Sequence, residues 1–94
     1  MLFMANLPYQ NLSHENNIII RCIQEASDDF ELKWHRDLYD RKVIVISGEN
    51  WMLQFENDTP FFLEKGKEYF IKKDQWHRVI KGKNDLFLEI KEIP

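Results

Sequence analysis

The 94-residue chain is poor in several residue types, and each shortage excludes a class of protein. It has one cysteine, Cys22, two alanines, three glycines and three prolines. A single cysteine forms no intramolecular disulfide and no cysteine-based zinc cluster, which favours a reducing, cytoplasmic location. No apolar run approaches the roughly 18 residues of a membrane span. Residues 1–12 also lack the pattern of a secretory signal. Neither a membrane protein nor a secreted one is expected.

The chain has no excess of positive charge. Its 13 lysines and arginines are outnumbered by 16 aspartates and glutamates, for a formal net charge of −3. A nucleic-acid partner is therefore not expected, because such partners are bound by basic surfaces. Hydrophobic residues make up 44% of the chain and aromatic residues 14%, which is enough to form the core of one folded domain.

The apolar residues that are present favour strands over helices. Alanine is scarce, whereas isoleucine, valine and the aromatic residues dominate the apolar set. Short apolar or alternating runs, separated by turn-forming residues, predict about eight strands. These are residues 17–25, 30–35, 41–47, 51–57, 61–64, 68–71, 76–81 and 85–92. Because no long helical segment lies between them, the sequence predicts an all-β fold, mainly antiparallel, arranged as a small sandwich or barrel.

The ends of the chain and one apolar strand bear on assembly. Residues 17–94 are expected to form a single β-barrel, and residues 1–16 an N-terminal arm that either packs on a partner subunit or frays. Residues 43–46 are apolar at every position, which indicates that both faces of this strand are covered. We therefore expect a homodimer, since a lone small barrel would leave one of these faces exposed.

Two of the three histidines are candidate metal ligands, and His14 is not. In a strand over residues 30–35, His35 and Asp37 would share one face with Glu31, and His77 could join them from a later strand. Two histidines and a carboxylate form the facial triad of non-haem Fe(II) oxygenases, which leaves coordination positions open. The same residues also occur at such spacings by chance, without a metal site.

The spacing around His77 resembles the second motif of the cupin family. That motif has a glycine, five residues, a proline, one residue, a glycine, two residues and a histidine. Here Gly66 to His77 keeps the spacing, with Lys72 in place of the proline and Asp74 in place of the second glycine. The flanking residues 70–71 and 78–79 also resemble the family pattern. Small cupin-like proteins of phages and bacteria with a Trp-His-x-Asp stretch are similar as well.

The first cupin motif is matched in spacing and altered in identity. It has His-x-His, three or four residues, a glutamate, six residues and a glycine. The chain has His35-x-Asp37, then Arg41, then Gly48 at the same intervals. Together the two motifs cover about residues 30–90. The resemblance implies a jelly-roll β-barrel in which His35, Asp37 and His77 hold one divalent transition metal, either Fe, Mn, Ni or Zn.

Arg41 stands where the family has a ligating glutamate. A guanidinium has no acceptor lone pair and stays protonated, so it cannot bind a metal. Arg41 could grip a small anionic ligand beside the metal, aided by Lys33 and by Gln54 as substrate-binding residues and by a catalytic hydroxyl from Tyr39. Alternatively, Arg41 could replace the metal by pairing with Asp37 or with Glu31.

These alternatives define the expected functions. The first is a small cupin that binds one divalent metal and binds or transforms a small anionic molecule, by oxygenase, isomerase or lyase chemistry. The second is a metal-free, non-catalytic ligand-binding or dimer-forming cupin in which Arg41 pairs with Asp37. A 2-oxoglutarate-dependent Fe(II) dioxygenase is a minor alternative, because 94 residues leave little room for a co-substrate site and a lid. A serine or cysteine hydrolase is not expected.

Overall fold

The computed structural model describes residues 9–26 and 30–94, and strands dominate them. A 3-10 turn, η2, covers Phe30–Leu32. The strands are β1 (Tyr9–Glu15), β2 (Ile18–Ile23), β3 (Asp40–Glu49), β4 (Met52–Phe55), β5 (Phe61–Phe62), β6 (Glu68–Ile71), β7 (His77–Ile80) and β8 (Lys83–Ile93). No helix in the described part of the chain is long and apolar enough to cross a membrane.

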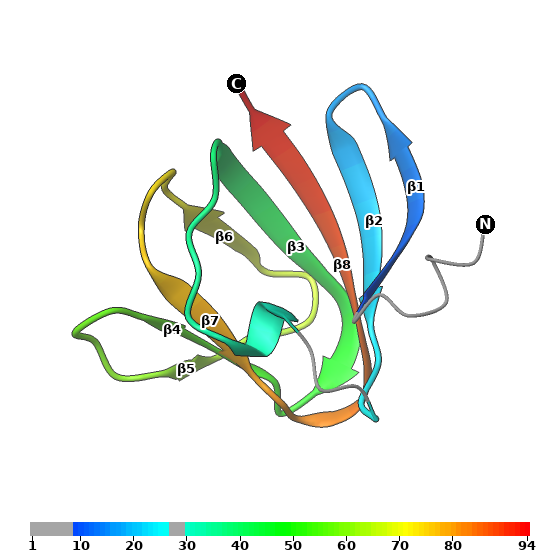
Figure 1. Cartoon of the computed structure of the whole chain (residues 1–94). Helices are drawn as coiled ribbons and strands as arrows, with labels where there is room; N and C mark the ends of the chain where they lie inside the picture. Colours follow the sequence, from blue (N-terminus) through cyan, green and yellow to red (C-terminus); the bar gives the residue numbers. More distant parts are fainter. Residues whose placement is uncertain (1–8, 27–29) are drawn as a thin grey trace.

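The strands form two antiparallel sheets (Figure 1). The larger has the order β1-β2-β8-β3-β6, and the smaller has the order β5-β4-β7. Every strand pairing within them is antiparallel. Neighbours in the sheets are often far apart in sequence, because the chain passes from one sheet to the other as a jelly roll does. The predicted fold, a small antiparallel jelly-roll barrel, is confirmed.

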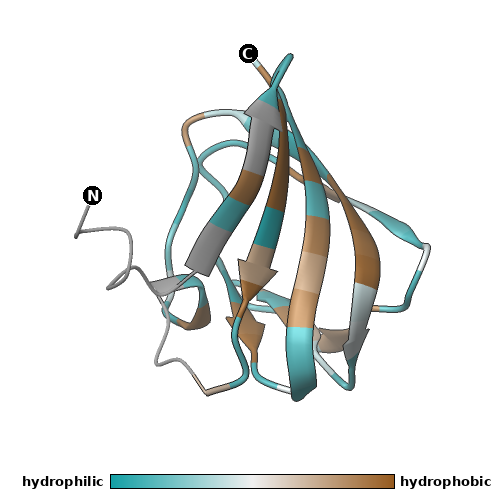
Figure 2. Ribbon diagram, turned by 90° about the vertical axis from the view of Figure 1, so that its right-hand side faces the viewer, coloured by the Kyte–Doolittle hydropathy of each residue, from teal (hydrophilic) through white to brown (hydrophobic). Residues whose placement is uncertain are grey.

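The core lies between the two sheets. Hydrophobic and polar residues alternate along the strands of the larger sheet, as the brown and teal bands in Figure 2 show. Val43, Val45 and Leu88 are among the side chains that alternation turns inward. Trp51 is completely buried, and its indole Nε1 donates hydrogen bonds to the carbonyls of Lys83 and Asn84. The aromatic ring thus closes one end of the core with its polar atom satisfied.

The strand expected over residues 30–35 is absent, and this prediction was wrong. Residues 30–32 turn as η2, and afterwards only His35 pairs with a strand, through an isolated bridge to His77. The turn buries the side chains of both Glu31 and His35, while Lys33 between them faces solvent. A local turn therefore places these two ionisable groups together, where the sequence pattern had indicated strand alternation.

Part of the expected N-terminal arm lies in the sheet. Residues 1–8 lie outside the described residues, but β1 pairs along its length with β2. The hairpin turn consists of Asn16 and Asn17, both with positive φ, which asparagine tolerates and which a two-residue turn of type I′ requires. The predicted boundary between residues 16 and 17 thus falls inside a hairpin turn.

Residues 43–46 alternate between the two faces of β3. Val43 and Val45 are buried, whereas Ile44 is half-buried and Ile46 is 41% exposed. One chain therefore covers only the inner face of this strand. The expectation that a second subunit covers the outer face stays a prediction.

Candidate metal centre

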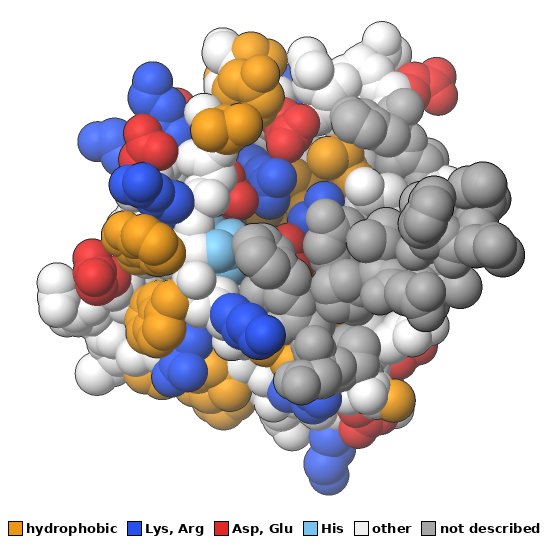
Figure 3. Space-filling model, in the orientation of Figure 1, with side chains coloured by type: hydrophobic (Ala, Val, Ile, Leu, Met, Phe, Trp, Pro, Cys, Tyr) orange, Lys and Arg blue, Asp and Glu red, His pale blue; other side chains and the backbone are white. Residues whose placement is uncertain are grey.

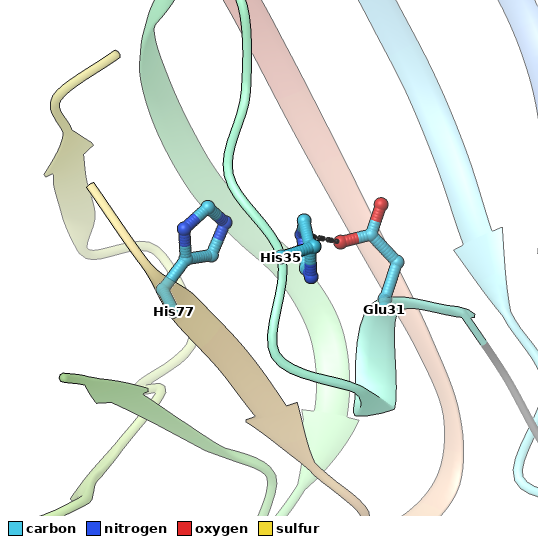
Figure 4. Close-up of side chains that lie close together, drawn as sticks. All are labelled: Glu31, His35 and His77. Atoms are coloured by element: carbon cyan, nitrogen blue, oxygen red, sulfur yellow. Dashed lines mark ion pairs between the residues drawn. The ribbon is translucent and has the colours of Figure 1, made fainter. Parts of the chain in front are cut away.

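A cluster of ionisable side chains lies between the sheets at the bridge of His35 to His77. Glu31 comes from η2, His35 from the segment that follows it, and His77 begins β7 (Figure 4). One donor atom from each residue lies within 4.8 Å of the others, and all three residues are buried. Figure 3 shows a histidine in a depression between acidic and basic side chains. The two imidazole centroids are 4.3 Å apart.

Backbone carbonyls fix the proton on both imidazole rings. The Nδ1 of His35 lies 2.7 Å from the carbonyl oxygen of Lys33, and the Nδ1 of His77 lies 2.7 Å from that of Gln75. A carbonyl only accepts hydrogen bonds, so each Nδ1 carries a proton and donates it. This is the arrangement in which metal-binding histidines are held, with Nε2 left as the coordinating atom.

Each Nε2 faces a carboxylate. The distance from His35 Nε2 to Glu31 Oε1 is 2.9 Å, and that from His77 Nε2 to Asp37 Oδ2 is 3.3 Å. If an imidazole is neutral and carries its proton on Nδ1, the lone pair of its Nε2 faces a lone pair of the carboxylate oxygen at these distances, which is repulsive. A cation shared by nitrogen and oxygen removes this repulsion, and it can be a proton or a metal ion. The donor set therefore fits a divalent metal.

The site shifts the pKa values of its acids and of one base in opposite directions. Burial alone raises the pKa of Glu31 and Asp37, but the facing histidine and the nearby arginines outweigh it, so the pKa of each carboxylate lies below its ordinary value. Burial lowers the pKa of His35, but the hydrogen bond and charge of Glu31 outweigh burial and raise this pKa above its ordinary 6.5. The site thus favours carboxylates and a cation on His35.

Two arginines neutralise the carboxylates. Arg21 of β2 is 4% exposed, and its Nη1 lies 2.7 Å from Glu31 Oε2. Arg41 of β3 lies 3.5 Å from Asp37 Oδ1 and 3.1 Å from Glu92 Oε2 of β8. The Nε of Arg41 is buried and has no hydrogen-bond partner among residues 9–26 and 30–94. It is therefore a buried donor whose hydrogen-bonding capacity is unsatisfied within the described chain.

The cavity beside this cluster is small. It has a volume of about 30 Å³ and is lined by Arg21, Glu31, Arg41 and His77 together with apolar side chains of the core. On the same measure, a cavity needs about 10–15 Å³ to hold one water molecule. Pockets for organic ligands usually measure about 300–1,000 Å³. The enclosed space suits an ion or a water molecule, so an organic ligand would have to lie at the mouth.

The predicted site residues divide into two groups. His35, Asp37, Arg41 and His77 come together as a cluster, although the set with all donor atoms within 4.8 Å contains Glu31 and omits Asp37. Asp37 as a metal ligand stays a prediction.

Lys33, Tyr39 and Gln54 lie away from the cavity, and their roles in ligand binding or catalysis stay predictions. Lys33 is exposed because η2 replaces the strand. Tyr39 is 43% exposed in the connection to β3. Gln54 alternates with the buried Leu53 and accepts a hydrogen bond from Arg78 on the outer face of the smaller sheet. None of the three lines the cavity.

The sequence reasoning missed three neighbours of this cluster. Glu31 was placed on the face of His35 but not assigned as a ligand, and its position four residues before His35 was an available signal. Arg21 and Glu92 come from β2 and from the end of β8. Their pairing with the cluster depends on sheet order, for which local spacing offers no signal.

Solved structures resemble this fold over most of the chain. A cupin-2 domain protein from Shewanella frigidimarina matches 90% of this chain and 79% of its own, with a TM-score of 0.65 and 20% identity. A DMSP lyase structure matches 78% of this chain and 35% of its own, with a TM-score of 0.65 and 18% identity. An Fe(II)-HppE structure with the alternative substrate (S)-1-HPP matches 81% of this chain and 41% of its own, with a TM-score of 0.64 and 17% identity.

These likenesses define the class of the molecule. The chain is an all-β jelly roll, and specifically it has the cupin fold, as the resemblance of its two motifs implied. It spans less than half the length of the lyase and HppE chains that it matches. No protein-family model and no curated protein sequence matches it.

Proposed function

We propose that this chain is a small cupin that binds one divalent transition metal through Glu31, His35 and His77. The observation that carries the proposal is the pair of buried imidazoles, each with Nδ1 bonded to a carbonyl and Nε2 directed at a carboxylate. Two histidines and one carboxylate suit iron, manganese, nickel or zinc, and this donor set does not select among them. Structural neighbours include an Fe(II)-bound protein, which supports the proposal.

The surrounding residues of the chain are expected to hold the ligands and balance their charge. Arg21 fixes the Glu31 carboxylate through its second oxygen, as outer-shell partners of metal ligands do. Asp37 lies beside His77 and is available as a fourth ligand. Arg41 would oppose a dication in a partly dry site, but Asp37 and Glu92 compensate its charge. A bound metal would supply a Lewis acid with open coordination positions.

We further propose that the ligand of this centre is a small anionic molecule bound through Arg41. Its buried Nε has no hydrogen-bond partner in the described chain, and a guanidinium matches the geometry of a carboxylate or phosphate. The cavity of about 30 Å³ would admit only the anionic group beside the metal. The class of reaction stays open, because oxygenase, isomerase and lyase chemistry can all use the same fold.

One observation favours a second candidate, a metal-free ligand-binding or dimer-forming cupin. Arg41 pairs with Asp37 at 3.5 Å, as that alternative expected, and Glu92 adds a shorter contact at 3.1 Å. In this version two imidazolium protons take the place of the metal, and the network is structural. The two candidates differ in a measurable way, because only the first binds a metal with the stoichiometry of a site.

Metal titration of chelator-treated protein tests the proposal. We expect one equivalent of Co(II) or Zn(II) to bind to the wild type. Glu31→Gln and His77→Gln should each weaken binding by roughly 100-fold or more, since each removes a ligand. The matched control is Glu64→Gln, an exposed glutamate that should leave affinity unchanged. Asp37→Asn shows whether Asp37 is a ligand.

The outcomes are distinct. Folding of each metal-free variant is checked by its melting temperature, so that loss of the site is separated from loss of the fold. Two results would overturn the metal-binding proposal and favour the metal-free ion-pair network. In the first, the wild type takes up no metal; in the second, the Glu31→Gln variant binds metal as tightly as the wild type.

A further inference from the structure

The tripeptide Trp-His-Arg occurs twice in the chain, and the two copies face each other. They are residues 34–36 and 76–78, paired antiparallel at the bridge between His35 and His77. The amide of each histidine donates to the carbonyl of the other, at 3.0 Å and 2.9 Å. This local pseudo-symmetry places Trp34 opposite Arg78 and Arg36 opposite Trp76.

The outer side of the bridge is covered by two arginine–tryptophan stacks. Neighbouring residues of an extended segment point to opposite faces, so the histidines point inward and their neighbours outward. The guanidinium carbon of Arg78 lies 4.9 Å from the Trp34 ring centroid, and that of Arg36 lies 5.2 Å from the Trp76 ring centroid. Both distances are within the range of a cation–π interaction.

The segment that carries His35 has little regular pairing of its own. In the described chain its bridge to β7 is isolated and contributes two backbone hydrogen bonds, and just beyond the bridge the Asp37 carbonyl accepts a third from the Asp74 amide at 2.9 Å. Such bonds are individually worth about 1 kcal/mol, and an exposed cation–π pair adds about 0.5–1 kcal/mol. The two stacks therefore contribute about as much to holding this segment against β7 as the two hydrogen bonds of the bridge do.

We propose that these two stacks, Trp34 with Arg78 and Trp76 with Arg36, form a clasp that sets the spacing of the His35 and His77 rings. The clasp residues are positioning residues, since they lie on the face opposite the imidazoles. The Trp34–Arg78 stack is the stronger half, because Arg78 Nε also donates to Gln54 of β4 at 2.9 Å. This inference rests on the proposed metal site.

A double-mutant cycle on Trp34 and Arg78 tests the clasp. Trp34→Leu and Arg78→Met should each weaken Co(II) binding by roughly 10-fold, the lower end for outer-shell changes. The double variant should be little weaker than either single variant, because both remove the same stack. Trp34→Phe should restore most of the affinity by returning an aromatic face. Phe62→Leu is the control, an exposed aromatic on β5 of the smaller sheet.

A second measurement keeps this test separate from the metal proposal. Amide hydrogen exchange in metal-free protein reports directly on the bridge, and the His35 and His77 amides should exchange faster in the clasp variants than in the wild type or in Phe62→Leu. Unchanged exchange at both amides would overturn the clasp, whatever the metal result. Faster exchange in a protein that binds no metal would support the clasp and overturn the metal site alone.

The outer face of the larger sheet carries two neighbouring rows of side chains with opposite charge. Strand register aligns Ile20, Glu89, Ile44 and Glu68 in one row across β2, β8, β3 and β6. The next row on the same face holds Ile18, Lys91, Lys42 and Phe70. One row is thus acidic and apolar, and its neighbour is basic and apolar. None of the four charged side chains pairs with another described residue.

We propose that a second copy of this chain covers this face. A two-fold axis in the interface, parallel to the rows and between them, would set the acidic row of one copy against the basic row of the other. Such self-complementarity is what an isologous dimer requires. The half-buried isoleucines of both rows would then supply the apolar contact that residues 43–46 lack in one chain.

Light scattering after size-exclusion chromatography tests the dimer. The wild type should have twice the 11.5 kDa mass of one chain. Glu89→Lys should raise the dimer dissociation constant by roughly 10-fold or more through like-charge contact. Adding Lys91→Glu to that variant should restore association, and Glu56→Lys, an exposed control next to β4, should have no effect. A monomeric wild type, or a dimer that is indifferent to both reversals, would overturn this proposal.

Discussion

Replacement of Arg21 by methionine is expected to destabilise the metal-free protein strongly. The Arg21 side chain is 5% exposed, and its guanidinium lies 2.7 Å from the Glu31 carboxylate, which is itself 10% exposed. The Nε of Arg21 also donates to Asn11 Oδ1 at 2.9 Å, which ties β1 to the cluster. Methionine keeps much of the side-chain volume, so the main loss is that of the charge beside a buried carboxylate.

The expected magnitude follows from this burial. Removing one partner of a buried ion pair costs about 3–5 kcal/mol, because the other charge stays in a poorly solvating site. The lower end applies here, since His35 remains 2.9 Å from Glu31 after the change. One kcal/mol shifts the melting temperature of a domain this size by about 4–8 °C, so a loss of about 3 kcal/mol lowers it by roughly 12–24 °C.

Thermal denaturation of chelator-treated protein at about pH 6 measures this effect while the carboxylates are ionised. The double variant Arg21→Met with Glu31→Leu should recover most of the stability, because it leaves no uncompensated buried charge. If Arg21→Met melts within about 4 °C of the wild type, the cost is below about 1 kcal/mol and the argument from burial is wrong.

Two further predictions concern pH and backbone geometry. The melting temperature of metal-free protein should be highest between about pH 4.5 and 6.5. Glu31 and Asp37 have lowered pKa values, so their contribution is present above the ordinary 4.5 and 3.8 and is lost as pH falls through the folded values. His35 has a raised pKa, so its contribution is present below 6.5 and is lost as pH rises through the folded value. A melting temperature that climbs steadily above neutrality would contradict this. In urea denaturation, Gly82→Ala should cost about 3 kcal/mol because its Cβ would clash with backbone of the β3–β4 turn, whereas Gly66→Ala, in open space at positive φ, should cost about 1 kcal/mol; equal costs would refute the distinction.

The fold was predictable because most strands of the barrel show a local alternation of apolar and polar residues. Residues 68–71 were predicted with the bounds of β6, and six further strands within a few residues of theirs. The region 30–35 alternates just as clearly, yet a strand needs a partner along its length, and here only His35 pairs with β7. For β1 the mainly polar residues 10–14 hide the strand, although the Asn16-Asn17 turn after it was an available signal.

The site was predictable only where spacing reflects proximity. The cupin-like spacing identified His35 and His77, which lie in contact although they are far apart in sequence. The residues that balance the charge of this pair were not predictable. Strand order and one turn of 3-10 helix bring Arg21, Glu31 and Glu92 to the cluster. Neither property can be predicted from the spacing of residues in the sequence.

The metal-binding and the metal-free candidate functions use the same arrangement of side chains, occupied by a metal ion in the first and by protons in the second. Three carboxylates, those of Glu31, Asp37 and Glu92, meet two guanidiniums, so the cluster carries one net negative charge when both imidazoles are neutral. A dication brings this to one net positive charge, and so do two protons at the Nε2 atoms. Neither occupant is favoured by total charge. The choice depends on the affinity of paired nitrogen and carboxylate donors for a metal against their affinity for protons, and such donors bind metals more tightly as pH rises. Arg41, which at first sight argues against a metal, is thus compatible with one, because its charge is already matched by Asp37 and Glu92.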